Sequence, residues 1–413
     1  MANTVLTPDI IAKEAVMILE NELVMAPKVY RGLESEFSNK VNGYEVGDTV
    51  SIRRPTDFTV RSGATASNQD VVEGKTSITV DQQKGVDFAF TSAELTLDIS
   101  ELSDRVIRPA MIQLANDVDQ SLMSLYSSVP NWVGTPGQTI NSFADYSKAP
   151  ERMDEFANPV ANRCGVLAPA DFWAMAGTQT GLFVSDVAKG AYRKGNLGEL
   201  AGVETYKAQN TPTHTVGVAT GTPVVNGASQ DTTWAATKDT NTQSLVTDGW
   251  TNSTTGILKK GDVFTIAGVY AVNPVTKATL TFLKQFVVTA DANSGASTGP
   301  ATLTISPPMI ASGAQQTVSA APADNAAITV LGASGASYRQ NMVFCRDAFA
   351  LAMVPMALPQ AAVKPSRQTY KGTSVRVTPY YDGTNDKSNW RLDILYGVKA
   401  IDPRLAVRVS GTA

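Results

Sequence analysis

The only histidine of the 413-residue chain, His214, lies in the Thr/Pro-rich segment Thr211–Thr215. A hydrolase of the Ser-His-Asp type needs a histidine as general base, with a serine and an aspartate held beside it. A Thr/Pro-rich linker is a poor platform for such a group, so we expect His214 to be a plain surface or linker residue. The sequence therefore predicts no catalytic residue.

The other side chains that could carry chemistry also lack the spacing of a site. Cys164 and Cys345 lie far apart without a metal-ligand pattern, so we expect two buried, reduced thiols. Asp117 and Asp119 fall on one expected helix, where a solvated polar face is the simpler interpretation. We therefore expect no metal, no cofactor and no enzymatic activity.

The composition limits the class of partner. Charged residues make up 17% of the chain and the formal net charge is −4, whereas a protein that reads DNA sequence normally has a strongly basic patch. Any contact with nucleic acid should therefore be loose. The N-terminus has no signal-peptide pattern, and no apolar run approaches the roughly 18 residues of a membrane span. We expect a protein that is made and used without crossing a membrane.

The clearest boundary in the chain is compositional. Between Glu204 and Arg339 there is neither arginine nor glutamate, and Thr, Ala, Gly, Asn, Val and Ser are abundant. Apolar residues alternate here with period two, as in antiparallel strands. The alternating pairs are Phe264/Ile266, Leu280/Phe282, Phe286/Val288, Leu303/Ile305 and Ile328/Val330. We expect an inserted barrel or sandwich with a long polar loop near Asp231–Thr255 that projects from it.

The segment before the insert begins with a helix and a strand pair. Thr7-Pro8-Asp9 is a good helix start. The apolar stripe that follows consists of Ile10, Ile11, Ala15, Ile18, Leu19 and Leu23. Val50 and Ile52 begin a strand, residues 78–90 supply its return, and the polar tip Thr56–Gly74 predicts a projecting β-arm. An isolated two-stranded ribbon is marginal in water, so we expect a neighbouring copy to cover this arm.

A long helix should follow the arm. We expect Ser100 to cap a helix that Pro109 interrupts, and the second part, Ala110–Ser128, carries apolar residues at helical spacing. This is expected to be the longest helix and the spine of a flat molecule. The rest mixes a short helix with alternating strands; these elements are Pro169–Trp173, Val375–Val377, Trp390–Val398 and Leu405–Val409. The predicted fold class is α+β.

This order of elements resembles the major capsid proteins of tailed bacteriophages with the Hong Kong 97-type fold. Three local segments are similar to that fold: Ile107–Asp119, Gly198–Glu204 and Leu395–Val398. The insert is similar, at Leu258–Val269, to the inserted domain of the coat proteins of Salmonella short-tailed phages. That similarity continues at Phe183–Ala191 and Trp390–Pro403.

The resemblance implies a division of the chain into seven parts. These are an N-terminal arm (1–40), an extended β-arm or E-loop (41–95), a spine helix with peripheral domain (96–149), a first axial part (150–205), an inserted β-barrel-like domain (206–336), a second axial part (337–389) and peripheral return strands (390–413). It also implies a major capsid protein that forms the icosahedral head shell from pentamers and hexamers.

The partners implied by the resemblance are other copies of the chain, a scaffolding protein, a portal protein and packaged double-stranded DNA, with a decoration protein as a further candidate. Such a protein assembles in the host bacterial cytoplasm, becomes part of the virion, and expands with the shell as DNA is packaged. Arm residues Arg53, Arg54, Arg61 and Lys75 are expected either to meet acids on a neighbour or to be solvated charges. Loop residues Asp231, Lys238, Asp239 and Asp248 are expected to reach neighbours across local twofold contacts.

Other classes remain open at this point. A phage tail-tube or decoration protein with an immunoglobulin-like insert is the nearest alternative, although a long helix after a β-arm argues against it. A hydrolase with a β-sandwich accessory domain would depend on His214. A carbohydrate-binding surface protein could use Trp132, Trp234 and Trp250 as platforms.

Overall fold

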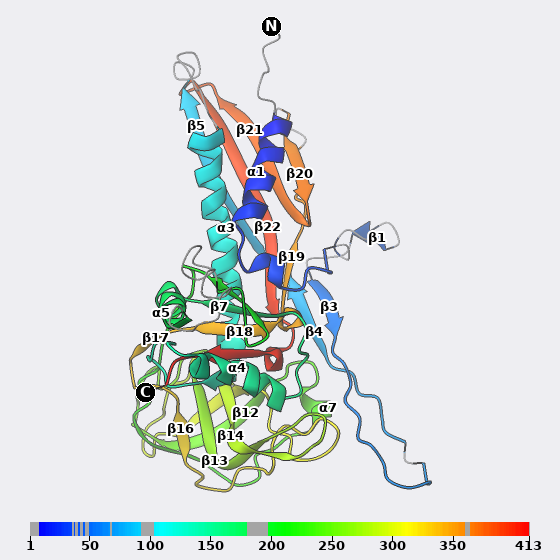
Figure 1. The fold of residues 1–413 in the computed structure, drawn as a ribbon, viewed down its shortest axis with the longest axis vertical. Helices are drawn as coiled ribbons and strands as arrows, with labels where there is room; N and C mark the ends of the chain where they lie inside the picture. The colour runs from blue at the N-terminus through cyan, green and yellow to red at the C-terminus, as the bar shows by residue number, and fades with distance from the viewer. Residues whose placement is uncertain are drawn as a thin grey trace. The chain divides into compact units, whose positions relative to one another are not determined.

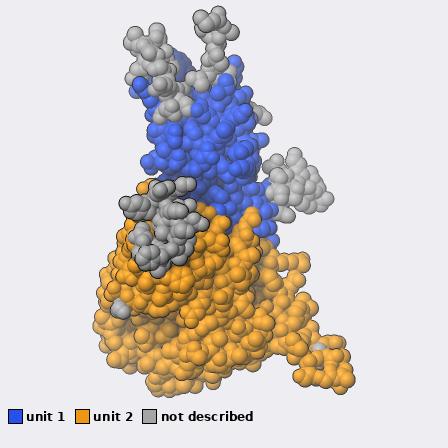
Figure 2. All heavy atoms as spheres, in the orientation of Figure 1, with its two compact units in different colours: residues 1–51, 77–122, 349–399 blue, residues 52–76, 123–348, 400–413 orange. Residues whose placement is uncertain are grey.

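The computed structural model of the protein describes residues 8–34, 37, 40–41, 44–45, 49–66, 68–91, 103–179, 197–359 and 364–412. The chain forms two compact units, each built from segments far apart in the sequence (Figure 2). Unit 1 contains residues 1–51, 77–122 and 349–399; unit 2 contains residues 52–76, 123–348 and 400–413. The expected caps Thr7 and Ser100 and the similar segment Phe183–Ala191 lie outside the described residues.

Unit 1 combines two long helices with an antiparallel sheet (Figure 1). Its elements, wholly or mostly, are α1 (Pro8–Glu22), η1 (Ala26–Lys28), β1 (Lys40–Val41), β2 (Tyr44–Glu45), β3 (Thr49–Arg53), β4 (Lys75–Thr79), β5 (Gln82–Thr91), η3 (Ser103–Ile107), α3 (Arg108–Met123), β19 (Phe349–Met353), β20 (Ser366–Tyr370), β21 (Thr373–Asp382) and β22 (Lys387–Ala400). The sheet runs β19-β22-β21-β20, and β5 also pairs with β22. The strands expected near Val375 and Trp390 are therefore confirmed.

The first helix buries a slightly different face from the one expected. Its buried residues are Ile11, Ala12, Ala15, Val16 and Leu19, which pack against β20 and β21. Ile10 is substantially exposed. The period of the sequence thus identified an apolar stripe. The buried face of the helix is shifted by about one residue from that stripe, because the position of the sheet decides which side is covered.

The spine helix is confirmed. A π-helical turn, η3, ends at Ile107, and α3 begins at Arg108 with Pro109 in its first turn, where the missing proline N–H costs nothing. The helix continues for 16 residues and is the longest in the described part of the chain. The expected apolar residues Met111, Leu114 and Val118 are all buried.

The return of the β-arm differs from the prediction. Only β4 pairs with β3, whereas β5 pairs with β22 over ten residues, from Gln82 opposite Tyr396 to Thr91 opposite Lys387. Val86, Phe88 and Phe90 alternate as expected, but they belong to the sheet of unit 1. Alternation identifies a strand and its buried face, and it does not identify the strand's partner.

Unit 2 contains a mixed sheet with helices, which we call the body. Its elements are η4 (Ser124–Ser128), β6 (Trp132–Val133), α4 (Phe143–Glu155), β7 (Arg163–Leu167), α5 (Pro169–Gln179), β8 (Glu199–Leu200), β9 (Val203–Lys207), β18 (Asn341–Cys345), η5 (Arg346–Ala348), η6 (Pro403–Leu405) and β23 (Ala406–Val409). The strand order is β6-β23-β18-β7-β9-β8. Cys164 and Cys345 lie on the paired strands β7 and β18, and both are buried thiols, as expected.

The insert is a closed six-stranded antiparallel barrel. Its elements are β11 (Gly221–Val225), α7 (Trp234–Thr237), β12 (Gln243–Trp250), β13 (Val263–Val272), β14 (Thr279–Val288), β15 (Ala301–Ser306) and β16 (Ile328–Val330). The order is β11-β12-β15-β14-β13-β16. The ends meet through a bridge between Val224 and Ala327 and a 3.0 Å bond from Val225 N–H to the Ala326 carbonyl. Closure removes the exposed edges that an open sheet would present. The chain enters the barrel through β10 (Thr213–Thr215) and leaves through β17 (Ser337–Arg339), which pair antiparallel.

The prediction of a long polar loop near Asp231–Thr255 is wrong. Residues 234–237 form α7, and residues 243–250 form β12, an internal strand of the barrel. Leu245, Thr247 and Trp250 point into the core, where the Thr247 hydroxyl donates to the Ala301 carbonyl (2.9 Å) and accepts from Trp250 Nε1 (2.9 Å). A polar strand is stable here because its hydroxyl groups have internal partners.

The predicted α+β class is confirmed by these elements. Within the described residues, no helix combines the length and apolar character needed to cross a membrane.

Candidate functional site

Three exposed apolar side chains lie on the arm, which we define as residues 52–76 of unit 2. Beyond β3 and β4 the arm has no regular secondary structure and extends as a narrow ribbon (Figure 2). Val60 is 99% exposed, Val71 is 64% exposed and Phe58 is 56% exposed. Isolated exposed apolar residues are ordinary, but three on one thin ribbon leave an apolar surface without cover.

Side chains replace backbone pairing at the tip of the arm. The Gln69 side-chain amide accepts from Thr59 N–H (2.9 Å) and donates to the Thr59 carbonyl (2.6 Å), as a strand would. The Arg61 guanidinium donates to the carbonyls of Gly63 and Thr65. These bonds give the tip a defined conformation without burying it.

The four basic residues predicted to meet a neighbour lie in two environments. Arg53 is 84% exposed and pairs with Glu73 of the same arm (3.2 Å), and Arg61 and Lys75 are also exposed. Arg54 is half-buried, and burial lowers the pKa of its guanidinium. The negative charge of Asp402 raises that pKa, but its effect is smaller than that of burial. Contact with a neighbour remains a prediction for all four, and Arg54 is the least suited to it.

The base of the arm is fixed to its own chain. Trp234 Nε1 of α7 donates to the Val72 carbonyl (2.8 Å). The Asp57 carboxylate lies 3.7 Å from Arg404, which also pairs with Asp402 at 2.8 Å. With its amide oriented to satisfy both partners, Gln315 donates to Asp57 Oδ2 (2.9 Å) and accepts from Asp57 N–H (2.8 Å). The base is therefore held while the tip is free.

A pocket of about 310 Å³ lies between this base and the barrel. Its lining includes Asp57 and Asp70 of the arm and Asp231, Trp234 and Ile310 of the barrel. The three carboxylates make the pocket acidic. Asp231, one of the predicted contact residues, thus faces the base of the arm.

The other predicted contacts of the insert do not share one loop. Lys238 and Asp239 follow α7, whereas Asp248 lies within β12. Asp239 is exposed, and Lys238 and Asp248 are partly buried. Their contact with neighbours stays a prediction.

Lys284 is a buried amine that the sequence reasoning missed. It lies on β14, with its nitrogen 4.7 Å from the centre of the Phe156 ring. Burial, together with the charges of Arg404 and Arg152, lowers the pKa of Lys284 to about 7. A signal was present in the sequence, because position 284 has the same parity as the alternating apolar residues Phe282 and Phe286.

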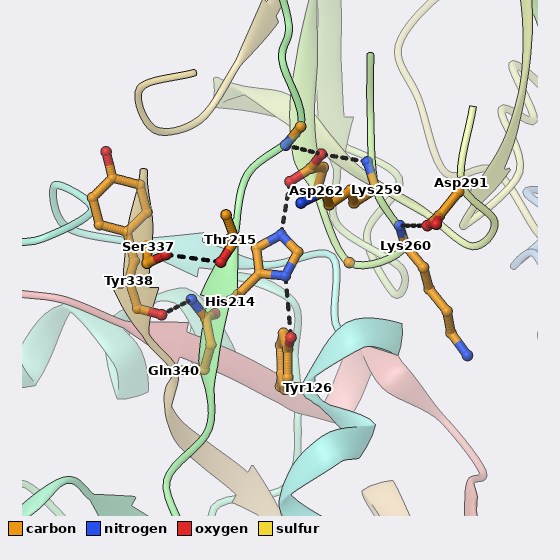
Figure 3. Close-up of polar contacts among 12 residues, drawn as sticks. Tyr126, His214, Thr215, Lys259, Lys260, Asp262, Asp291, Ser337, Tyr338 and Gln340 are labelled. Atoms are coloured by element: carbon orange, nitrogen blue, oxygen red, sulfur yellow. Dashed lines mark hydrogen bonds and ion pairs between the residues drawn. The ribbon is translucent and has the colours of Figure 1, made fainter. Parts of the chain in front are cut away.

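The prediction that His214 is a surface or linker residue is wrong. The side chain is only 4% exposed. Its Nε2 lies 2.7 Å from Asp262 Oδ1, and its Nδ1 lies 3.1 Å from the Tyr126 hydroxyl (Figure 3). Asp262 Oδ2 also accepts from the backbone N–H groups of Gly217 (3.0 Å) and Lys259 (2.7 Å). The antiparallel pairing of β10 with β17 turns the supposed linker into a strand that buries this imidazole.

The order Tyr126–His214–Asp262 has the form of a proton relay, but its chemistry does not favour a nucleophile. Burial raises the pKa of the Tyr126 phenol, so the phenolate is disfavoured. The Arg408 guanidinium lies 5.3 Å from the centre of the same ring. The hydrolase alternative therefore has no activated hydroxyl group at this histidine.

Arg408 is the other charged side chain of this region, and it is fully buried. It lies against the rings of Tyr126 and Trp132, and its Nη1 donates to the carbonyl of Gly261 (2.8 Å). Its Nε and Nη2 have no hydrogen-bond partner among the described residues. Burial lowers the pKa of Arg408 to about 9.

The expectation of a solvated Asp117/Asp119 face is wrong for Asp119. Its carboxylate is buried and accepts from the backbone N–H groups of Val24 (2.7 Å), Met25 (3.1 Å) and Ala26 (3.2 Å), just after α1. Burial raises the pKa of Asp119 to about 6, although the three hydrogen bonds act to lower it. Asp117 is partly exposed and accepts from the Tyr396 hydroxyl (2.8 Å).

Two further features bear on the alternative functions. Within the described residues, no group of three or more His, Cys, Asp or Glu side chains is arranged to hold a metal ion. Trp132 and Trp250 are buried, and Trp234 donates to the arm, so these tryptophans do not form the exposed aromatic platform that a carbohydrate-binding surface needs.

The structure thus combines an exposed arm, a long helix and an inserted barrel. The sequence matches the P22 coat protein family (gene protein 5) over residues 1–411. The chain therefore belongs to the P22 coat protein family, and it is the major capsid protein of a tailed phage. As a capsid protein it is a component of the virion.

The chain is also similar to individual proteins. The chain is 23% identical, over 408 residues, to the major capsid protein of Acyrthosiphon pisum secondary endosymbiont phage 1, covering 95% of this chain and 94% of that one. A solved structure from Mycobacterium phage Che8 is similar at 13% identity and a TM-score of 0.48, covering 94% of this chain and 90% of that one. The CUS-3 coat protein I-domain is 29% identical over 27% of this chain and 96% of its own length, with a TM-score of 0.19. Family membership and the elements described above confirm the expected Hong Kong 97-type fold.

Proposed function

We propose that copies of this chain tile an icosahedral head shell as pentamers and hexamers, and that the arm of each copy is covered by a neighbour. The exposure of Phe58, Val60 and Val71 carries this proposal. Covering them removes apolar surface from water at about 25 cal/mol per Å². The arm's base is fixed to its own chain while its tip remains uncovered, so the tip is presented to another molecule.

Val60→Asp tests this proposal directly. A charge at a 99% exposed position should leave the monomer folded but prevent shells, because the neighbour would have to bury an unpaired carboxylate. Val275→Asp is the matched control, since Val275 is 71% exposed on the turn between β13 and β14, outside the arm. Electron microscopy should show shells for the wild type and Val275→Asp, and monomers for Val60→Asp. Normal shells from Val60→Asp would contradict the role of the arm.

Shell assembly favours many modest contacts. An interface of about 1,200 Å² or less lets a wrongly placed copy dissociate, and the closed shell is then held by many contacts at once. Arg53, Arg61 and Lys75 on the arm and Asp231, Lys238, Asp239 and Asp248 on the barrel supply exposed or partly exposed charges for such contacts. Exposed pairs of this kind contribute only about 0–1 kcal/mol each.

The proposal extends to the further partners that the resemblance to phage coat proteins implies. Assembly takes place in the host cytoplasm around a scaffolding protein, closes on a portal protein and expands as double-stranded DNA is packaged, and a decoration protein is a candidate for the outer face. A net charge of −4 supports weak, salt-sensitive contact with DNA. Electron microscopy with and without a candidate scaffolding protein tests the first step. Tubes in place of shells would favour a tail protein.

The seven-part division of the chain belongs to the same proposal. The barrel strands β11 to β16 lie between residues 221 and 330, inside the expected insert 206–336. The arm, spine, axial and peripheral regions would then correspond to residues 41–95, 96–149, 150–205 with 337–389, and 390–413. Deleting residues 208–340, which joins the end of β9 at Lys207 to the start of β18 at Asn341, tests whether the remainder folds as one body.

A further inference from the structure

The barrel is joined to the body by only two chain connections. These connections pair as the short strands β10 and β17, with three residues in each. A two-stranded ribbon of this length is marginal in water, so the connections alone would let the barrel change its angle. Side chains restrict that motion. Gln285 of β14 accepts from Trp132 N–H (2.8 Å) and donates to the Trp132 carbonyl (2.7 Å).

The turn Lys259–Asp262, which precedes β13, lies against η4. Its Gly261 has a φ of +101°, and a Cβ added there would lie 3.2 Å from Cβ of Ser127 in η4. The Gly261 carbonyl accepts from Arg408 of β23 at 2.8 Å. The turn is thus packed tightly against η4 and bonded to the body.

His214 is the residue on which these parts converge. It belongs to the connecting strand β10, it contacts Asp262 in the barrel turn, and it contacts Tyr126 in η4 (Figure 3). The Asp262 carboxylate is fully buried and bonds to His214, Gly217 and Lys259. Without the imidazole, Asp262 Oδ1 would lose its only side-chain partner among the described residues. A folded protein avoids such a loss by moving the group toward water.

We infer that His214 is a positioning residue that fixes the angle of the barrel on the body, by tying the barrel turn at Asp262 to the segment that follows the spine helix at Tyr126. The barrel core does not include this histidine; its apolar residues, such as Phe264, Phe286 and Leu303, form their own cluster. Loss of the contact should therefore loosen the joint and leave the barrel folded.

Hydrogen exchange on the full-length monomer tests the joint without any assembly. His214→Phe keeps the bulk of the ring and removes both contacts, and Tyr126→Phe removes only one. For His214→Phe we expect at least tenfold faster exchange in residues 208–218 and 331–340, with β14 and β15 unchanged. Tyr126→Phe should show a smaller change in the same segments.

Two matched controls separate the joint from ordinary polar contacts. Asp291 accepts from the backbone N–H of Lys260 in the same turn (2.7 Å) but is exposed to solvent, so Asp291→Asn should change nothing in the connecting segments. Tyr146→Phe removes a buried hydroxyl contact with Thr205 (2.8 Å) inside the body and should also leave them unchanged. Unchanged exchange in His214→Phe would overturn the inference. Equal loss of protection in β14 and β15 would also overturn it, because His214 would then be a general stability residue.

Assembly provides a second measurement, which rests on the proposed function. A loosened barrel angle should give shells of mixed size or open sheets for His214→Phe, while both controls form shells of one size. If the wild type forms no shells, the proposed shell function fails while the exchange result stands. If His214→Phe loosens the joint and still forms uniform shells, the positioning role in assembly is overturned.

Discussion

The arm and the barrel joint use polar side chains in opposite ways. On the arm, Arg53 and Glu73 pair in water, where an exposed ion pair contributes little. At the joint, His214 and Asp262 pair in the interior, and the removal of one partner leaves a buried polar group without this hydrogen bond. The arm can therefore lose a contact without a change in its own fold, whereas the joint cannot.

This difference fits what each region has to do. A surface that binds and releases neighbours benefits from contacts that are individually weak and reversible. A mount that sets the direction of a domain needs contacts that hold one geometry, and a fully bonded buried network does so. The chain thus has its weak, reversible contacts on the exposed arm and the contacts that hold one geometry at the buried joint.

The largest stability effect is expected at Asp119. Like Asp262 at the joint, Asp119 is a buried and hydrogen-bonded carboxylate, but it lies in unit 1. Asp119→Ala removes the acceptor of three backbone N–H groups after α1, and we expect the free energy of unfolding to fall by about 3 kcal/mol. Asp117→Ala, at a partly exposed position on the same helix, should cost about 1 kcal/mol or less. Urea unfolding of both variants measures the difference. Equal losses would mean that burial does not distinguish the two acids.

Asp119 should also make stability depend on pH. Its pKa rises from 3.8 to about 6 on folding, so the native state binds this proton more tightly than the unfolded chain does. The resulting stabilisation is fully present below pH 4 and is lost as the pH rises through 6, with a total of about 3 kcal/mol. The side-chain amide in the variant Asp119→Asn cannot titrate. The free energy of unfolding of the wild type minus that of the variant should therefore decrease from pH 4 to pH 7. Parallel profiles would contradict the assignment.

Lys284, near the base of the arm, should show an effect of opposite sign. Its pKa of about 7 lies below the usual 10.5, so folding works against its charge, most strongly below pH 7 and less as the pH rises toward 10.5. Lys284→Met keeps the length and removes the charge, and we expect a gain of about 2 kcal/mol at pH 7. Lys277→Met, at a less buried lysine on the β13–β14 turn, should change little. A Tm that falls in Lys284→Met would show that the amine has a stabilising partner.

The smallest stability effect is expected on the arm. Arg53→Glu should change the free energy of unfolding by less than about 0.5 kcal/mol, because its pair with Glu73 is exposed. Assembly should nevertheless decrease if Arg53 meets an acid on a neighbour. The charge-swapped variant Arg53→Glu with Glu73→Arg restores the pair within the arm. Shells restored by the swap would place the role of Arg53 inside its own arm, and shells still absent would place it at a neighbour. Arg54 is a poor choice for this test, because its half-buried side chain would confound folding with assembly.

The periodic features of the sequence predicted most of the fold. The alternating pairs around Phe264, Phe286 and Leu303 identified barrel strands, and the apolar spacing from Met111 to Leu122 identified the spine helix. These predictions succeeded because one side of each element faces a core, and a single core-facing side imposes its period on the sequence. The loop expected near Asp231–Thr255 failed because threonine and serine fill a strand as well as a loop when their hydroxyl groups are bonded.

The candidate sites were less accessible to sequence reasoning. The projecting tip of the arm followed from its polar residues, but the pairing of β5 with β22 did not, since alternation does not choose a partner. Lys284 could have been placed in the barrel by its parity. For His214 there was no comparable signal, because the three residues of β10, Thr213–Thr215, are too few to show a period.

The sequence by itself determined the α+β class, the existence of an inserted β-module, the spine helix and the resemblance to phage coat proteins. These depend on local periodicity, composition and the order of segments along the chain. Only the tertiary structure decided that the insert closes into a barrel and that Asp119 and His214 are buried and bonded. Those outcomes depend on which distant segments meet, as Tyr126, His214 and Asp262 do, and a carboxylate or imidazole becomes buried through the packing of its partners, whatever its neighbours in the sequence are.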